Sequence, residues 1–345
     1  MKKRIYLILI CCTVVVLLGC TLEALFPHDK QVMIMTYNVQ NLFDPYVNGN
    51  EYPEYTPEQG WSAQAYRKRL QRTASAVTQG HKLVPTIILF QEIENILVLQ
   101  DLVSTHLSRH GFYQIAATND ADSPIQVGIA SCYPITEVRI HAVKGSRSIL
   151  ECRLDINGSD LVIFNLHAKS RIGGVEETES QRRATAAAVT YRVKELLTYD
   201  PFLPIIVGGD FNESADAAIR EPTTFDHALV PLQLPEAYRL GQEGSFVLSG
   251  EAPSENSWYT CWLDRKALLS SAGSGSYLYN GVWESFDQLL LNSAFFDRFG
   301  LEYHSAVLGS HSPLVDTKGR PVSYDLKTGQ GYSDHLPVAV ILSLP

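Results

Sequence analysis

Short apolar runs recur along the chain, and they constrain its fold more than any other feature. They lie at residues 32–37, 86–91, 127–131, 149–155, 161–166, 205–208, 286–291 and 338–342. Several lack the polar alternation of a strand with one solvated face, so they are predicted to be strands covered on both faces. Amphipathic helical patterns occur at residues 61–78, 96–110 and 180–199. The sequence therefore predicts a mixed α/β domain in which helices cover the sheets.

The chain has 345 residues, of which 45% are aliphatic or aromatic, so it can bury a large core. No linker divides the middle of the sequence, and a single domain is predicted over residues 31–345. Residues 214–284 are richer in Ser, Gly, Pro and Tyr. We expect this stretch to be a loop-rich insertion at the rim of the domain.

The first thirty residues have the pattern of a targeting segment. Basic residues 2–4 precede an apolar stretch, residues 5–18, that is too short to span a bilayer comfortably. The stretch ends in Leu17-Leu18-Gly19-Cys20, which resembles the lipobox of bacterial lipoproteins. This predicts a signal peptide over 1–19, an acylated Cys20 at the start of a tether over 20–30, and an extracytoplasmic protein anchored to the membrane of a bacterial cell envelope. An ordinary signal peptide and an uncleaved anchor are the alternatives.

Removal of residues 1–19 leaves 25 basic and 37 acidic residues, a net charge of −12. Such a surface argues against a dedicated duplex-binding protein, although a divalent metal could reverse the field locally in a nuclease. Three cysteines besides Cys20 remain in the mature chain, at positions 132, 152 and 261, without metal-site spacing. A disulfide between Cys132 and Cys152 is one reading, and two buried thiols are the favoured one.

Polar side chains cluster at the ends of the apolar runs. The clusters are Asn38, Gln91-Glu92, Asn165 with His167, Asp210 with Asn212, Asp287, and Ser333-Asp334-His335. A lone carboxylate after a strand is usually a helix cap or a turn residue. Several such clusters in one chain, all of metal-ligand or acid–base types, indicate a ligand site at the strand ends. Carboxylates with few histidines and no cysteine favour Mg²⁺ or Mn²⁺.

Read in order, these motifs resemble the endonuclease/exonuclease/phosphatase superfamily, and finer details such as residues 37–44 resemble its bacterial secreted branch. The resemblance runs from about residue 32 to residue 343. It implies a deoxyribonuclease I-like fold, a four-layered αββα sandwich. It also implies one metal-dependent phosphoesterase site between the two sheets.

The resemblance also implies roles for individual residues. Glu92 would be the chief metal carboxylate, assisted by Asn38 and Asp334. Asp210 would orient or deprotonate the attacking water, and Asn212 would hold that water or a phosphate oxygen. His335 would contact the scissile phosphate with its ring fixed by Asp287. The last residue of the set, His167, would be the candidate to protonate the leaving oxygen.

Several basic residues and one serine near these motifs are candidates for binding substrate phosphates. Arg171 and Lys169 are the principal ones, with Arg147 and Ser170 as further candidates, while Arg182-Arg183 would lie at the rim. A solvated basic face is the alternative for all of them. Tyr277 is expected to pack in a late hairpin. The sequence departs from the family pattern at Gln40, where many nucleases carry a charge, and in residues 120–126, which lack the arginine often found there.

Three functions remain open from the sequence. The first is a surface-anchored Mg²⁺-dependent nuclease, a monomer that acts on extracellular DNA or RNA. The second is a phosphoesterase acting on sphingomyelin, inositol phosphates or nucleotides. The third is a catalytically silent lipoprotein that uses the sandwich as a binding platform.

Overall fold

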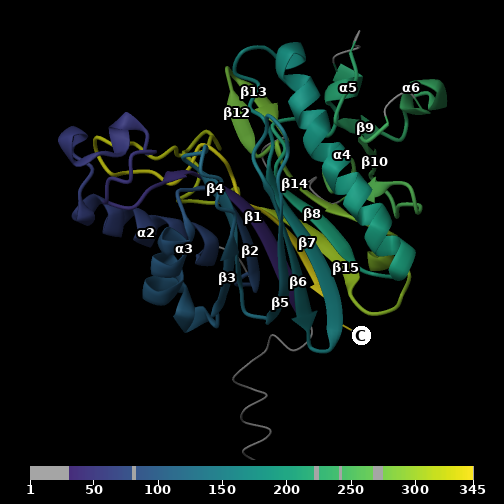
Figure 1. Cartoon of the computed structure of the whole chain (residues 1–345), viewed down its shortest axis with the longest axis horizontal. Helices are drawn as coiled ribbons and strands as arrows, with labels where there is room; N and C mark the ends of the chain where they lie inside the picture. The colour runs from purple at the N-terminus through teal and green to yellow at the C-terminus, as the bar shows by residue number, and fades with distance from the viewer. Residues whose placement is uncertain (1–30, 80–82, 221–224, 241–242, 267–274, 345) are drawn as a thin grey trace, which may run out of the picture.

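Two large β-sheets form the centre of the protein, in a computed structural model that describes residues 31–79, 83–220, 225–240, 243–266 and 275–344 (Figure 1). The six-stranded sheet has the order β15 (Glu302–Leu308), β16 (Val338–Ser343), β1 (Gln31–Leu42), β2 (Ile87–Ile93), β4 (Gln126–Ser131) and β3 (Gln114–Ala117). The eight-stranded sheet has the order β5 (Ile135–His141), β6 (Ile149–Ile156), β7 (Ser159–His167), β8 (Ile205–Asp210), β14 (Asp287–Leu291), β11 (Trp258–Tyr259), β10 (Phe246–Ser249) and β9 (Leu229–Pro231). A small hairpin pairs β12 (Tyr277–Tyr279) with β13 (Val282–Glu284).

Helices cover the outer face of each large sheet (Figure 1). The helices are α2 (Ala63–Thr78), α3 (Ile96–Leu102), α4 (Val175–Tyr199), α5 (Ala217–Arg220) and α6 (Glu236–Leu240), with short 3₁₀ turns at Pro53–Tyr55, Pro57–Gln59, Ser108–His110 and Ser293–Phe295 and a π-helical turn at Val103–Leu107. Buried residues of α2 join the core of the six-stranded sheet, and those of α4 join the core on the outer face of the eight-stranded sheet. The predicted four-layered αββα sandwich is thereby confirmed.

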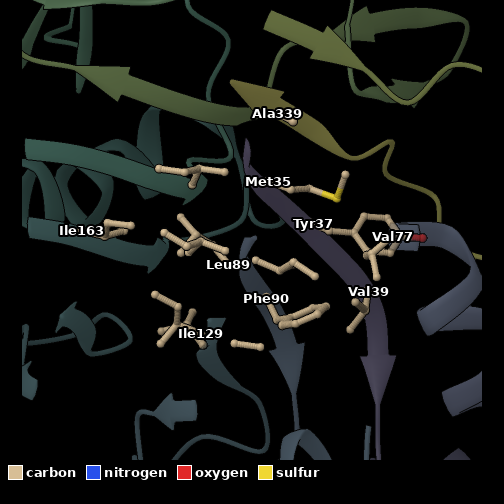
Figure 2. Packing of buried hydrophobic residues seen from close by; sticks show 14 of the residues in the cluster. Met35, Tyr37, Val39, Val77, Leu89, Phe90, Ile129, Ile163 and Ala339 are labelled. Atoms are coloured by element: carbon tan, nitrogen blue, oxygen red, sulfur yellow. The ribbon is translucent and has the colours of Figure 1, made fainter. Parts of the chain in front are cut away.

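Side chains alternate along each strand between the face that meets the other sheet and the face that meets the covering helices. Successive residues of a strand point to opposite faces, and Figure 2 shows Leu89 and Phe90 of β2 doing so. Leu89 points toward the other sheet, where a Cβ on Gly208 would come within 2.5 Å of its Cδ1. The glycine therefore allows β8 to approach β2 closely.

Polar caps fix where two of the helices begin. Ser62 accepts a hydrogen bond from the backbone N–H of Ala65 at 3.2 Å, and α2 starts after it. Asn95 accepts from the N–H groups of Leu97 and Val98 and starts α3 in the same way. Such caps stabilise a helix by about 1 kcal/mol each.

All eight predicted strands are present, but some elements differ from expectation. The helix predicted over 96–110 ends at Leu102 and continues as π and 3₁₀ turns, while α4 begins five residues before the predicted start, at Val175. Residues 214–284 are not only a rim, because β9, β10 and β11 extend the eight-stranded sheet. Cys132, Cys152 and Cys261 are all free thiols.

The predicted signal peptide, Cys20 and the tether lie outside the described residues. Among the helices that the structure describes, none combines the length and the apolar character needed to span a bilayer.

Candidate active site

The faces that the two sheets turn toward each other are apolar along most of their length and polar at one end. Because side chains alternate, every second residue of a strand lies on this shared face. The polar residues that end these rows are Thr36 and Asn38 on β1, Gln91 on β2, Asn165 and His167 on β7, and Asp210 on β8. β1 runs parallel to β2 and β7 runs parallel to β8, so within each sheet the carboxyl ends meet. The candidate active site lies at this end of the sandwich.

Two antiparallel strands begin where the parallel strands end, and they bring the remaining candidates to the site. Asp287 at the start of β14 is the direct partner of Asp210 on β8. His335 precedes β16, which pairs antiparallel with β1. Residues far apart in sequence therefore meet because of strand direction.

Unusual backbone conformations accompany the site residues. Glu92 has φ +64° and Asn212 has φ +50°, in the left-handed region that non-glycine residues rarely adopt. Gly209 has φ +134°, and a Cβ there would meet the Leu166 carbonyl oxygen at 1.9 Å, so only glycine can precede Asp210. Strained residues of this kind concentrate at functional sites. The register of β2 against β4 shifts at Glu92, which turns its side chain toward the site.

Asn38 links the carboxylates of the two sheets. Its Nδ2 donates hydrogen bonds of 3.0 Å to both Glu92 Oε1 and Asp210 Oδ2. Its Oδ1 accepts from the backbone N–H of Gln40. In this arrangement Asn38 orients two carboxylates through its amide NH₂ group, and its role as a metal ligand stays a prediction.

The expected contact between Asp287 and His335 is present. Asp287 Oδ2 accepts hydrogen bonds from His335 Nδ1 at 2.8 Å and from the Ser276 hydroxyl at 2.6 Å. The Tyr277 ring packs on the imidazole with centroids 4.6 Å apart, so it does more than pack within its hairpin. Burial opposes the charged imidazolium, but the carboxylates of Asp287, Asp210 and Asp334 outweigh it. The pKa of His335 therefore lies well above its usual value.

The other candidate histidine has the opposite electrostatics. His167 Nε2 lies 3.5 Å from Asp210 Oδ2 and 3.9 Å from Glu92 Oε1. Burial, together with the nearby charges of Arg147 and His335, holds the pKa of His167 well below its usual value. Its buried Nδ1 finds no hydrogen-bond partner among the described residues.

Asp210 lies between the two histidines. Burial raises the pKa of its carboxyl to about 7, against the lowering effect of His335. Its Oδ1 accepts from the backbone N–H of Asn212 at 2.8 Å, and Asn212 Nδ2 donates to the Ala168 carbonyl. A carboxyl that titrates near neutrality can exchange a proton with water at physiological pH.

Glu92 and Asp334 carry the carboxylate oxygens that would hold the predicted divalent metal. Burial raises the pKa of Glu92, and the nearby charge of Asp334 raises it further. A cation beside the Glu92 carboxylate would relieve this destabilisation, and oxygen ligands are those that Mg²⁺ prefers. The residues therefore fit a divalent metal. Gln40 positions Asp334, because its Oε1 accepts from the backbone N–H of that residue at 3.0 Å.

A polar bridge behind the site ties the two sheets together. Gln91 Nε2 donates to Asn165 Oδ1 at 2.8 Å, and the Thr36 hydroxyl donates to Gln91 Oε1. Asn165 Nδ2 in turn donates to the carbonyls of Phe90 and Gly128. Buried amides with complete hydrogen bonding rigidify a core, so this bridge fixes β2 of one sheet against β7 of the other beneath the ligands.

Two of the basic candidates, Arg171 and Arg147, lie beside the site. Arg171 Nε donates to the Asn212 carbonyl at 3.0 Å and its guanidinium lies over the Phe286 ring, at the edge of the site. Arg147 is close enough to lower the pKa of both His167 and Glu92, so it supplies a cation where residues 120–126 have no arginine. Lys169 lies on the same loop as Arg171, and its carbonyl accepts from Arg182.

The expected rim position of Arg182 is wrong. Its side chain is fully buried and pairs with Glu179 at 2.6 Å, because the loop before α4 closes over it. Glu179, Glu213 and His227 form a buried group with ligand atoms within 4.8 Å of one another. Arg182 already neutralises Glu179, and His227 Nδ1 bonds Glu213 at 2.5 Å, so this group is a closed ion network within the described residues.

Ser276 and Tyr277 were not predicted as site residues. Ser276 directly precedes β12 and Tyr277 is its first residue, and Tyr277 forms an isolated bridge with His335. No motif marks them in the sequence, because their contacts depend on where a distant hairpin packs.

Comparisons with known proteins agree with this architecture. Residues 33–222 match the Endonuclease/Exonuclease/phosphatase family. Truncated Caenorhabditis elegans TDP2 is similar in structure with a TM-score of 0.53 and 15% identity, over 91% of this chain and 98% of that chain. A family protein from Bacteroides thetaiotaomicron has a TM-score of 0.52 and 14% identity, over 91% and 98%. D. rerio TDP2 complexed with a single-strand DNA product has 0.50 and 15%, over 90% and 98%. No curated protein matches the sequence.

At these identities the structural neighbours establish the fold alone, which is that of the deoxyribonuclease I-like proteins. The matched segment covers more than half of the sequence. The chain belongs to the endonuclease/exonuclease/phosphatase family, whose members hydrolyse phosphodiesters and phosphate esters. The resemblance inferred from the sequence motifs is thereby confirmed.

Proposed function

We propose that this chain is a metal-dependent phosphodiester hydrolase, a nuclease that cleaves DNA or RNA outside the cell. The observation that carries the proposal is the pair of buried histidines beside Asp210. Nε2 of His167 and Nε2 of His335 lie 3.5 Å and 3.9 Å from the same Asp210 Oδ2. Their pKa values shift in opposite directions, so one ring is neutral and the other is charged at neutral pH.

The charged ring, that of His335, would bind the anionic phosphodiester. A phosphodiester carries a negative charge that grows on its oxygens as a nucleophile approaches, so a fixed cation lowers the barrier. The His335 imidazolium would neutralise this charge, while Asp287 and the Tyr277 ring hold the imidazole in place. An orienting carboxylate behind a histidine is known from other hydrolases.

Asp210 and His167 divide the proton transfers. Asp210, with a pKa of about 7, would accept a proton from the attacking water as its oxygen forms the new bond to phosphorus. The bond to the leaving oxygen then breaks, and that oxygen needs a proton. Neutral His167 would first donate a hydrogen bond there. Once the bound phosphate raises its pKa, it would take up a proton from the surrounding water and pass that proton to the leaving oxygen.

A divalent ion completes the charge balance. Glu92 and Asp334 would hold Mg²⁺ or Mn²⁺, with Asn38 assisting as the sequence predicts. When bound, the ion polarises the phosphoryl oxygen and stabilises the leaving group. The cation would offset the burial and the nearby charge of Asp334 that raise the pKa of Glu92.

Nucleic acid is the favoured substrate. The zebrafish structural neighbour was observed with a single-strand DNA product. Arg147 and Arg171 at the edge of the site provide local cations on a chain with an overall net charge of −9. We further propose that the protein is a monomer held in the bacterial cell envelope by acyl chains on Cys20. Its acidic surface and its membrane anchor are also compatible with a lipid or small-molecule phosphoester as substrate.

A substrate panel tests the proposal. The full-length chain is incubated with plasmid DNA, RNA, sphingomyelin, a nitrophenyl phosphodiester and a nitrophenyl phosphomonoester, each with Mg²⁺ or with EDTA. We expect Mg²⁺-dependent release of acid-soluble nucleotide. His167→Ala should lower diester cleavage by roughly 10²–10⁴-fold and leave any monoester cleavage nearly unchanged. The matched control is His304→Ala, which removes an exposed histidine of β15.

Two outcomes would overturn the proposal. Wild-type protein that cleaves no phosphate ester in the panel would support the silent binding lipoprotein. Cleavage of sphingomyelin or nucleotides without cleavage of DNA or RNA would support the second function.

A further inference from the structure

The end of the sandwich opposite the active site, which we call the basal end, is where β1, β8 and β15 begin. Gln31, the first residue of β1, pairs with Ser343 of β16, which in turn pairs with Glu302 of β15. On the other sheet, the beginning of β8 pairs with the end of β14. The chain therefore enters the domain at the basal end.

Two exposed phenylalanines lie at this end. Phe202 is 76% exposed just before β8, and Phe299 is 79% exposed just before β15. Every other phenylalanine that the structure describes is buried or half-buried. These two exposed apolar rings at one end of the domain are available to contact an apolar partner.

Phe202 and Phe299 lie in turns with the same hydrogen-bond pattern. Asp200 Oδ1 accepts from the backbone N–H of Phe202 at 3.1 Å, and Asp297 Oδ1 accepts from that of Phe299 at 2.8 Å. Each turn reads Asp-x-Phe in the sequence. The carboxylates fix the backbone, so the rings project from ordered tips.

The two turns and the point of chain entry lie at the same end of the domain. Asn292, which leads toward Phe299, donates through Nδ2 to the carbonyl of Leu203, the residue after Phe202. Gln31 and Glu302 are separated by the single strand β16, which places them about 10 Å apart at ordinary strand spacing. The chain before Gln31 therefore reaches the domain beside the turn that carries Phe299.

We propose that the basal end docks on the bilayer that holds the acyl chains of Cys20, with Phe202 and Phe299 in the interfacial layer. This inference rests on the membrane anchoring included in the proposed function. Ten residues, 21–30, separate Cys20 from Gln31 and span at most about 33–36 Å. Aromatic rings favour the membrane interface, and one protein with both acyl chains and inserted rings is held in a defined orientation.

This orientation selects the substrate class. Asn38 follows Gln31 by seven residues, so the site lies roughly 23 Å along β1 from the basal end. A docked basal end directs the site away from the bilayer and toward the surrounding solution. Soluble polyanions would then reach it, whereas headgroups of the same bilayer would not.

Fluorescence in vesicles tests the docking. The acylated mature chain, residues 20–345, is placed in phosphatidylcholine vesicles with or without brominated acyl chains, which quench nearby tryptophan. The variants are Phe202→Trp and Phe299→Trp, and the control is Tyr46→Trp, at a 71% exposed position after the carboxyl end of β1. After subtraction of the wild-type signal, we expect quenching and a blue shift for the two basal variants and neither for the control. Equal quenching at all three positions, or at none, would overturn the docking.

Two further readouts separate this inference from the proposed function. Mass spectrometry of the extracted chain must show acyl groups on Cys20, and their absence would overturn the docking. DNA cleavage by the same vesicles should match that of detergent-solubilised protein, and sphingomyelin mixed into the vesicle lipid in a parallel preparation should be left intact. Loss of DNA cleavage with the basal quenching retained would refute the nuclease and leave the docking standing.

Discussion

Replacing Asp287 with asparagine tests whether the carboxylate keeps His335 charged. The substitution preserves the size of the side chain and its capacity to bond the Ser276 hydroxyl. It removes the negative charge that lies 2.8 Å from His335 Nδ1 in a buried position. Burial alone lowers the pKa of this imidazole, so without Asp287 the charged form should be lost at a lower pH.

The size of the effect follows from the contact. A hydrogen bond to a charged group contributes about 1.5–3 kcal/mol. Two unit charges about 4 Å apart interact by about 4 kcal/mol at the effective dielectric constant of protein sites. Both values describe the same interaction, so we expect a loss of about 3 kcal/mol, or roughly a hundredfold in kcat/KM.

The assay is hydrolysis of a nitrophenyl phosphodiester from pH 5 to pH 9 with a Mg²⁺ titration at each pH. Because His335 is active as a cation, activity in Asp287→Asn should fall at a lower pH than in the wild type, while the Mg²⁺ midpoint is retained. The matched control is Asp160→Asn, at an exposed residue paired with Arg153. A variant that keeps both the wild-type rate and the wild-type pH profile would refute the pairing as a catalytic device.

Three other substitutions probe the metal, the ion network and the pH dependence. Glu92→Gln should raise the Mg²⁺ midpoint about tenfold or more, and an unchanged midpoint would contradict its role as a ligand. Arg182→Met should lower the free energy of unfolding in urea by about 3–5 kcal/mol, because it leaves Glu179 buried and unpaired; an effect as small as that of Arg183→Met would refute this. Burial raises the pKa of Glu151, but hydrogen bonds from His141 and Arg192 outweigh it and lower that pKa to about 2. This group therefore stabilises the fold above its unfolded pKa of 4.5, so Glu151→Gln should cost up to about 3 kcal/mol at pH 7 and progressively less as the pH falls toward 2, as urea midpoints would show.

The sequence predicts the central strands because they are buried on both faces and therefore have continuous apolar runs. The edge strand β5 escapes prediction since most of its residues are exposed and carry no such pattern. α4 starts earlier than predicted because Glu179 appears polar in the sequence but is buried by its pairing with Arg182. Local sequence patterns indicate which apolar residues are buried, but they do not show that a charged residue is buried when an oppositely charged side chain pairs with it.

For the candidate site, polar clusters at the strand ends indicated in the sequence the carboxylates and histidines that the fold brings together, while their roles follow from the family resemblance and stay predictions. The sequence could not show that Asn38 bridges Glu92 and Asp210, since the bridge depends on how the two sheets pack. It also could not place Tyr277 on His335, because that contact comes from a separate hairpin. The opposite pKa shifts of the two histidines arise from burial and neighbours that only the folded chain defines.

The central claim is that the buried cluster around Asp210 hydrolyses phosphodiesters. The most direct measurement is the initial rate at which full-length wild-type protein and Asp210→Asn release acid-soluble nucleotide from plasmid DNA with Mg²⁺. We expect cleavage by the wild type and by the Asp160→Asn control, and a loss of roughly 10²–10⁴-fold in Asp210→Asn. Equal rates for wild type and Asp210→Asn, or no cleavage by the wild type, would contradict this claim.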